Sequence, residues 1–178
     1  MIKKFLIIVF MFGLFNKTSI SNAEVAHNFK FESIDGQEMN LSNYKDKVLV
    51  VNVASRCGFT SQYEGLQEIW DEFKDKNVVV IGVPSNNFKQ EPGSNKEIKD
   101  FCETNFNISF PMTEKMDVVG NNAHPFFIWA KESYGKSAIP KWNFHKIIVG
   151  KDGRIAKTFS SITSPSSKKF RKALEDLI

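Results

Sequence analysis

Cysteine is scarce in this chain, which has only Cys57 and Cys102 among its 178 residues. No C-x-x-C or C-x-x-x-C pair occurs, because Thr60 and Ser61 stand three and four positions after Cys57. Dithiol exchange within a single loop is therefore excluded. The three histidines are scattered, and none has zinc-type spacing to a cysteine, so the sequence predicts no metal site and no bound cofactor.

Apolar runs of membrane-spanning length are also missing. The N-terminal run "FLIIVFMFGLF" is too short to cross a bilayer as a helix. Two lysines precede it, and a polar stretch ending in the small residues "SNA" follows it. This three-part pattern predicts a secretory signal peptide over residues 1–23, with an uncleaved anchor as the alternative. After cleavage the protein is expected to be exported, periplasmic or secreted, without a stable membrane anchor.

Most of the excess positive charge belongs to that segment. The chain has 24 basic and 20 acidic residues, and three of the basic ones lie within 1–23, which leaves a net charge of +1. The run "KKFRK" near the C-terminus is interpreted as the solvated face of a last helix. Binding to nucleic acid requires a clustered basic patch, so the sequence predicts no nucleic-acid partner.

The order of predicted elements indicates a single α/β domain over 24–178. The β-branched runs at 47–55 and 77–85 are typical of central strands buried on both faces. Apolar spacing and capping residues predict the helices, and Asp-Gly pairs predict the turns of two hairpins. The expected elements are a hairpin after residue 27, a strand at 47–55, a helix at 62–75, a strand at 77–85, helices at 95–106 and 124–133, a hairpin at 144–159, and a last helix capped by Ser164. A β-α-β half followed by a β-β-α half is the thioredoxin arrangement, here with an N-terminal β-hairpin and an inserted helix.

Cys57 follows the end of a predicted central strand in the stretch "ASRCGFT". Functional crevices of open α/β sheets lie at the carboxyl ends of the strands, where backbone N–H groups favour a thiolate. This position indicates a nucleophile. The alternatives are a buried structural thiol, a staple to Cys102 of the kind that exported proteins form, and a protease-type pair with a histidine, which no sequence feature supports.

Four segments resemble the glutathione peroxidase family. Residues 52–66, "NVASRCGFTSQYEGL", are similar to the family's active-site signature in its cysteine form, and residues 82–98 are similar to its second signature, P-C-N-Q-F-x-x-Q-E-P-G. Residues 141–153 carry the family's W-N-F, and residues 110–127 also follow its pattern. The resemblance extends over essentially the whole chain after the signal peptide. It implies a thioredoxin fold and the reduction of hydrogen peroxide and organic hydroperoxides by thiols, in antioxidant defence.

Carried over residue by residue, the resemblance makes Cys57 the peroxidatic residue, with Trp142 and Asn143 as its polar supporters. An indole N–H and an amide N–H both donate to a thiolate. Attack of the thiolate on the peroxide bond gives a sulfenic acid. The structural alternative for Trp142 is an aromatic plug of the core.

The second signature departs from the family pattern in two places. Asn87 stands where the family has a glutamine, one methylene longer, and the loop after Phe88 is one residue shorter than usual. Asn87 is expected to serve as the third supporter, with plain turn chemistry as the alternative. Gln90 is a candidate to shift toward the site, although the sequence does not favour it as the substitute.

Ser85 replaces a cysteine that is common in that motif, so Cys102 is the one candidate partner for Cys57. The resemblance implies that Cys102 is a resolving cysteine, as in family members with thioredoxin-type donors. The expected co-substrate is glutathione or a thioredoxin-like protein. Because Cys102 lies on a predicted helix and a disulfide requires close Cα atoms, local unwinding is expected. The alternative is a buried helix thiol.

The short segment before W-N-F lacks the long insertion of tetrameric family members, so a monomer is expected. Pro140 resembles in position the cis-proline of thioredoxin folds. Two other function classes stay open at this point. One is a peroxide sensor that passes oxidation to another protein, and the other is a binding protein with a structural bridge between its cysteines.

Overall fold

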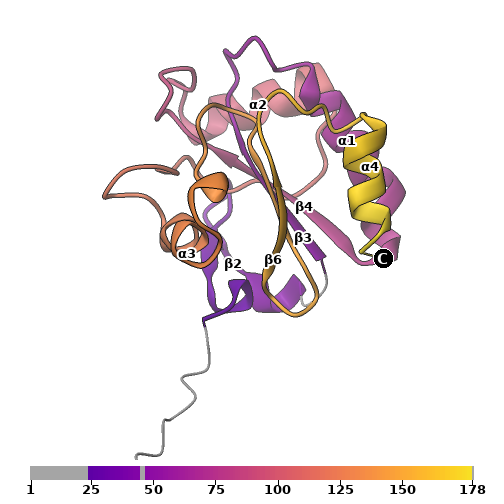
Figure 1. Cartoon of the computed structure of the whole chain (residues 1–178). Coiled ribbons are helices and arrows are strands. Elements are labelled where there is room, and N and C mark those ends of the chain that lie inside the picture. Colours follow the sequence, from indigo (N-terminus) through magenta and orange to yellow (C-terminus); the bar gives the residue numbers. More distant parts are fainter. Residues whose placement is uncertain (1–23, 45–46, 178) are drawn as a thin grey trace, which may run out of the picture.

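A four-stranded sheet stands at the centre of the molecule (Figure 1). The computed structural model describes residues 24–44 and 47–177, so the predicted signal peptide lies outside the described residues. The strand order is β4-β3-β5-β6, with β3 parallel to β4 and antiparallel to β5, and β5 antiparallel to β6. The strands are β3 (Lys47–Val53), β4 (Val78–Pro84), β5 (Lys146–Val149) and β6 (Ile155–Phe159).

Helices cover both faces of this sheet. In Figure 1, α1 and α4 lie together on one side and α3 lies on the other, while a two-stranded N-terminal hairpin packs near α3. The remaining elements are β1 (Lys30–Glu32), β2 (Glu38–Asn40), α1 (Gln62–Phe73), α2 (Asn95–Phe106), α3 (Pro125–Tyr134) and α4 (Lys168–Glu175). The predicted thioredoxin fold, a single α/β domain with an N-terminal β-hairpin and an inserted helix, is confirmed.

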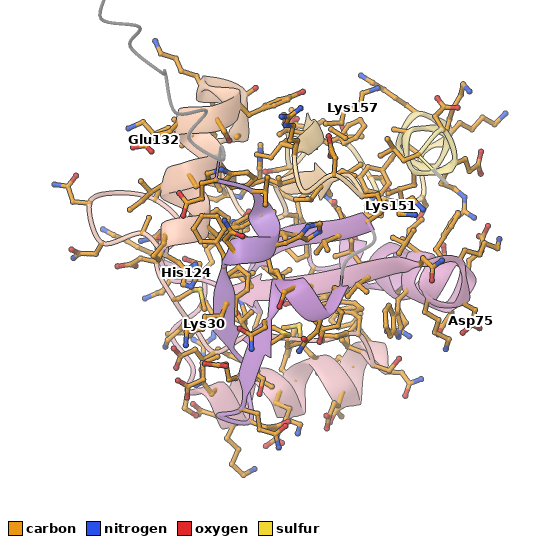
Figure 2. All side chains as sticks on the ribbon, turned by 90° about the horizontal axis from the view of Figure 1, so that it is seen from below. Lys30, Asp75, His124, Glu132, Lys151 and Lys157 are labelled. Carbon is orange, nitrogen blue, oxygen red and sulfur yellow. The ribbon has the colours of Figure 1, made fainter. Side chains whose placement is uncertain are left out.

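The central strand β3 divides the core into two layers. All seven of its residues are buried, as the β-branched run predicts. Leu49, Val51 and Val53 face the layer beneath α1, α2 and α4, whereas Val48 and Val50 face the layer beneath α3 and the hairpin. Figure 2 shows side chains filling the space between the sheet and α2. Within the described residues, no helix has the length and apolar character needed to cross a membrane.

Two predicted helix starts are confirmed by their caps. The S-x-x-E pattern of Ser94 and Glu97, which predicts a capping box at the start of the 95–106 helix, forms one in α2, since each side chain accepts from the other residue's backbone N–H. His124 precedes α3, and its Nδ1 accepts from the backbone N–H of Phe126. The other ring nitrogen of His124 lies 3.0 Å from the carbonyl oxygen of Lys30, and Figure 2 shows the two residues side by side. This contact ties α3 to the hairpin.

The predicted start of the last helix was wrong by three residues. Ser167, not Ser164, is the N-cap of α4, and its hydroxyl accepts from Phe170 N–H. The chain forms a turn over Pro165 and Ser166 because these residues pack against Gly65 of α1, where a Cβ would lie only 2.6 Å from the Ser166 hydroxyl. The predicted cis-proline was also wrong. No described peptide bond is cis, and Pro140 has the trans form that X-Pro bonds favour intrinsically.

Candidate functional site

Three chain segments meet at one edge of the sheet. Cys57 follows the carboxyl end of β3, and residues 85–91 follow the carboxyl end of its parallel neighbour β4. The W-N-F segment precedes β5, which runs antiparallel to β3, so it arrives at the same edge. The topology therefore brings together the sequence segments that carry the predicted site residues.

Cys57 lies in a series of turns rather than at the first residue of α1. The helix begins five residues later, at Gln62, and the intervening turn is closed by a hydrogen bond from Thr60 N–H to the Cys57 carbonyl oxygen. The backbone N–H of Phe59 donates to Cys57 Sγ at 3.4 Å. The side chain is 5% exposed. The donor at the sulfur is thus a single local amide, not the helix terminus that the sequence suggested.

The buried carboxylate of Glu91 accepts two hydrogen bonds from Ser55, two residues before Cys57. Glu91 is 1% exposed, and its Oε2 accepts from Ser55 N–H at 2.6 Å and from the Ser55 hydroxyl at 2.9 Å. Burial raises the pKa of Glu91, and the two Ser55 bonds oppose this effect. A cavity of about 190 Å³ lies between the Ser55–Glu91 pair and the first half of α2.

The W-N-F segment is fixed from β3 by Asn52. The Asn52 amide donates to the Trp142 carbonyl oxygen at 3.2 Å and accepts from His145 N–H at 3.1 Å, while the Asn52 carbonyl oxygen accepts from Phe144 N–H at 2.6 Å. Phe144 has φ = +62°, a left-handed conformation that a bulky residue rarely adopts. Such outliers persist where the surrounding structure over-determines them, and they gather at functional sites.

Gln90 connects the Cys57 turn to Asn143. Its carbonyl oxygen accepts from Arg56 N–H at 3.0 Å, and its side-chain Oε1 accepts from Asn143 Nδ2 at 2.8 Å. Asn143 is fully buried, and its Oδ1 has no hydrogen-bond partner among the described residues. An unpaired buried acceptor costs about 1–3 kcal/mol and calls for an explanation in a native site.

The shortened loop explains how Gln90 reaches this place. Lys89 N–H bonds back to the Asn86 carbonyl oxygen at 2.9 Å, and Lys89 has φ = +57°. Because this turn is short, the next residue, Gln90, lies beside the W-N-F segment and bonds Asn143. The sequence analysis predicted Asn87, and not Gln90, as the third polar supporter of Cys57.

Both ends of the Asn87 amide make hydrogen bonds to residues other than Cys57. Its Nδ2 donates to Asp117 at 2.7 Å, and its Oδ1 accepts from Val118 N–H at 2.6 Å and Val119 N–H at 3.2 Å. The Ser85 hydroxyl donates to the same oxygen at 3.0 Å. Asn87 therefore anchors the 117–119 loop in this structure, and its role in a reaction remains a prediction.

Trp142 lies at the surface of the site. It is 40% exposed, and its ring packs against Phe88 with centroids 5.5 Å apart. Its indole N–H makes no hydrogen bond to any residue in the described ranges. The residue is thus not the core plug that was the structural alternative, and it offers a free donor.

Cys102 lies in a different environment, in the middle of α2. It is 1% exposed, and burial raises the pKa of its thiol to about 11. The hydroxyl of Tyr63, also fully buried, lies near enough to the sulfur to oppose this rise but makes no hydrogen bond of normal geometry. Burial raises the pKa of Tyr63 as well, with smaller effects from nearby Cys102, Glu91 and Cys57. Both cysteines are free thiols in this structure.

The described residues contain no cluster of three or more histidine, cysteine, aspartate or glutamate side chains suited to hold a metal. Sequence reasoning missed Asn52, Glu91 and the role of Gln90. One signal was present for Asn52, since a lone polar residue inside the apolar run "VLVVNV" must find partners when buried.

Fold and site together define a thioredoxin-fold oxidoreductase with one thiol at the functional edge of its sheet. The family model for glutathione peroxidase matches residues 26–131. The glutathione peroxidase homolog BsaA of Bacillus subtilis is 44% identical over 156 residues, which cover 84% of this chain and 93% of the relative. The hydroperoxy fatty acid reductase gpx1 of Synechocystis is 42% identical over 149 residues, covering 78% and 88%.

A solved structure supports the same assignment. The apo form of Trgpx superposes with a TM-score of 0.67 and 32% identity, covering 86% of this chain and 97% of that one. The chain belongs to the glutathione peroxidase family. It is an oxidoreductase that reduces peroxides at the expense of thiols.

Proposed function

We propose that peroxide is reduced at Cys57 through a sulfenic acid. The thiolate attacks one oxygen of the peroxide, an S–O bond forms as the O–O bond breaks, and the other oxygen leaves as water or an alcohol after taking a proton. The sulfur is oxidised by two electrons and the peroxide is reduced by two. The observation that carries this proposal is the pair of hydrogen bonds that Gln90 accepts, one from Arg56 N–H and one from Asn143 Nδ2, which hold the Cys57 turn and Asn143 together.

The donors around the site suit an anionic sulfur. The Phe59 N–H already points at Sγ, and the indole N–H of Trp142 has no competing acceptor among the described side chains. Hydrogen-bond donors of this kind stabilise the thiolate form of Cys57. They form no covalent bond to the sulfur, so the thiolate stays available as a nucleophile. They also stabilise the charge that develops on the leaving oxygen.

Cys102 is proposed as the resolving thiol. Its sulfur attacks the Cys57 sulfenic acid, an S–S bond forms, and the hydroxyl leaves as water. Cys102 lines a cavity of about 370 Å³ on the hairpin side of α2, and the walls of this cavity do not include Cys57. Because Cys102 is buried within α2, we propose that the step requires α2 to unwind locally, which also exposes a thiol whose pKa the core holds at about 11.

The disulfide is then reduced by a dithiol protein of the thioredoxin type, with glutathione as the alternative donor. A donor comparison tests both steps: peroxide turnover with glutathione against turnover with a thioredoxin system, in wild type, Cys57→Ser and Cys102→Ser. We expect wild type to turn over faster with thioredoxin. Loss of this turnover in Cys102→Ser supports the resolving role, and unchanged peroxide consumption in Cys57→Ser contradicts the proposed function.

Export of the protein is part of the proposal, and it rests on the three-part pattern of residues 1–23. Fractionation of expressing cells followed by N-terminal sequencing tests it, with a mature N-terminus at Glu24 as the expected result. A monomer is proposed from the short segment before W-N-F, and sedimentation measures it directly.

A peroxide sensor is the second candidate, because Asn87 does not supply its amide to the sulfur in this structure. A sensor oxidises once and passes the oxidation to a partner protein. Many rapid cycles with a thiol donor favour the enzyme, and a single oxidation event favours the sensor.

A further inference from the structure

We propose that Gln90, rather than Asn87, is the amide residue that positions the peroxidatic site. This inference rests on the proposed role of Cys57. Within the described residues, Gln90 is bonded both to the residue before Cys57, through Arg56 N–H, and to Asn143, through its side-chain amide. Asn87 has neither bond: its Nδ2 donates to Asp117, and its Oδ1 accepts from the backbone N–H groups of Val118 and Val119 and from the Ser85 hydroxyl.

The orientation of the Asn143 amide is the property that Gln90 sets. In this structure Asn143 Nδ2 donates to Gln90 Oε1, so the opposite end of the Asn143 amide is Oδ1, buried and unpaired. An unpaired oxygen is the wrong polarity for a thiolate or a leaving oxygen, which both require a donor.

A half-turn of both amides reverses this polarity without moving any other atom. The nitrogen and oxygen of a side-chain amide have nearly the same size, and the terminal torsion is roughly two-fold. After the half-turn, Gln90 Nε2 donates to Asn143 Oδ1, and Asn143 Nδ2 takes the buried position that now holds the unpaired oxygen. Formation of the thiolate favours this second arrangement, because a donor then replaces an acceptor at that position.

The geometry of the shortened loop is consistent with this assignment. The left-handed turn at Lys89 brings Gln90 to the W-N-F segment, and the next residue, Glu91, accepts two hydrogen bonds from Ser55, which directly precedes Arg56. Gln90 is half-buried, and no described residue accepts from its Nε2. That nitrogen is therefore free to become the donor.

Two variants separate positioning from simple structural support. Gln90→Met keeps the length of the side chain and removes the amide. Gln90→Glu keeps an acceptor for Asn143 Nδ2 and removes the donor, so a merely structural bond survives in it. The measured quantity is the rate of Cys57 oxidation by hydrogen peroxide in a single turnover. It is measured at increasing pH until the rate no longer changes, which is the plateau where the thiol is fully ionised. The plateau excludes effects that act only through the pKa of the thiol.

We expect the plateau rate to fall by at least about tenfold in both variants, while circular dichroism and thermal unfolding stay close to wild type. Asn87→Ala is expected to lower the melting temperature and to change the plateau rate by less than about threefold. A wild-type plateau rate in Gln90→Glu would overturn the proposal, and so would an equal or larger loss in Asn87→Ala. Cys57→Ser is measured in parallel. If it still reduces peroxide, the proposed function itself fails; if it is inactive and the Gln90 variants are normal, only this inference fails.

Discussion

The two cysteines of this protein lie in opposite kinds of surroundings. Cys57 stands in a turn at the edge of the sheet, with a backbone N–H at its sulfur, while the Glu91 carboxylate and the Gln90 carbonyl oxygen accept from the two residues before it. Cys102 stands inside a helix, in an apolar layer, where burial favours the neutral thiol. The difference suggests that one thiol is arranged to react at once, and that the other reacts only after its helix has opened.

Removal of Cys57 is the strongest way to break this comparison. Cys57→Ser is expected to lower the rate of peroxide consumption by at least about 10³-fold, because the nucleophile is lost while Cys102 stays neutral and buried. The measurement is peroxide loss with a thioredoxin system as donor. A residual rate close to wild type would show that Cys102 reacts on its own.

Cys102→Ser should divide the reaction into its two steps. We expect one equivalent of peroxide to be consumed in a burst, followed by turnover with the thioredoxin system that is lower by about 100-fold, since no disulfide forms for a dithiol to attack. Rapid-mixing kinetics measure both phases. Undiminished steady-state turnover would remove Cys102 from the cycle.

The pKa of Cys102 predicts a pH dependence of stability. Its folded value of about 11 lies above that of an unfolded thiol, so the unfolded state loses its proton first as the pH rises. The neutral Cys102 thiol therefore contributes about 2–3 kcal/mol to the free energy of unfolding. This contribution is fully present below about pH 9 and is lost as the pH rises through about 11. Urea unfolding of wild type and Cys102→Ala over this range measures it, because all other groups cancel in the difference. A pH-independent difference would contradict the buried, neutral thiol.

Trp142→Phe tests whether the indole N–H assists the reaction of Cys57 with peroxide. Phenylalanine keeps the packing on Phe88 and removes the indole donor, so we expect Cys57 oxidation to slow by about tenfold. Trp70→Phe on α1 is the matched control, since that partly buried ring packs against the core and belongs to none of the three segments of the site. Equal rates in both variants would mean that the indole N–H takes no part.

The smallest expected effect concerns the helix that must open. Ser94→Ala removes the capping box of α2 and is expected to lower the free energy of unfolding by about 1 kcal/mol. It should also raise the rate of Cys102 alkylation by about fivefold, because the helix opens more often. Ser167→Ala removes the similar cap of α4 and should destabilise without this rise. The same alkylation rate in both variants would argue against local opening of α2.

Much of the fold was predictable because its signals are local. The β-branched run of β3, the capping box of α2 and the Asp-Gly turns each specify their own element. The start of α4 was not predictable, because Pro165 and Ser166 pack against Gly65 of another helix, and the sequence of the turn does not contain that contact.

The site divides in the same way. Cys57, Trp142 and Asn143 were predicted from short motifs, and the topology brings their segments to one edge of the sheet, while their roles in the reaction stay predictions. The bond between Gln90 and Asn143 was not predictable, because a loop shorter by one residue changes which amide side chain contacts Asn143. That change depends on the left-handed turn at Lys89 and on the carbonyl bond to Arg56, which are three-dimensional features.

The most direct test of the central claim is to trap the sulfenic acid itself. Cys102→Ser is mixed with one equivalent of hydrogen peroxide in the presence of dimedone, which reacts with sulfenic acids, and the adduct is located by peptide mass mapping. In parallel, wild type treated with peroxide and no dimedone is mapped for disulfides. The proposed mechanism predicts an adduct at Cys57 in the variant and a Cys57–Cys102 disulfide in wild type. A variant that consumes the peroxide without forming an adduct at Cys57 would contradict the account.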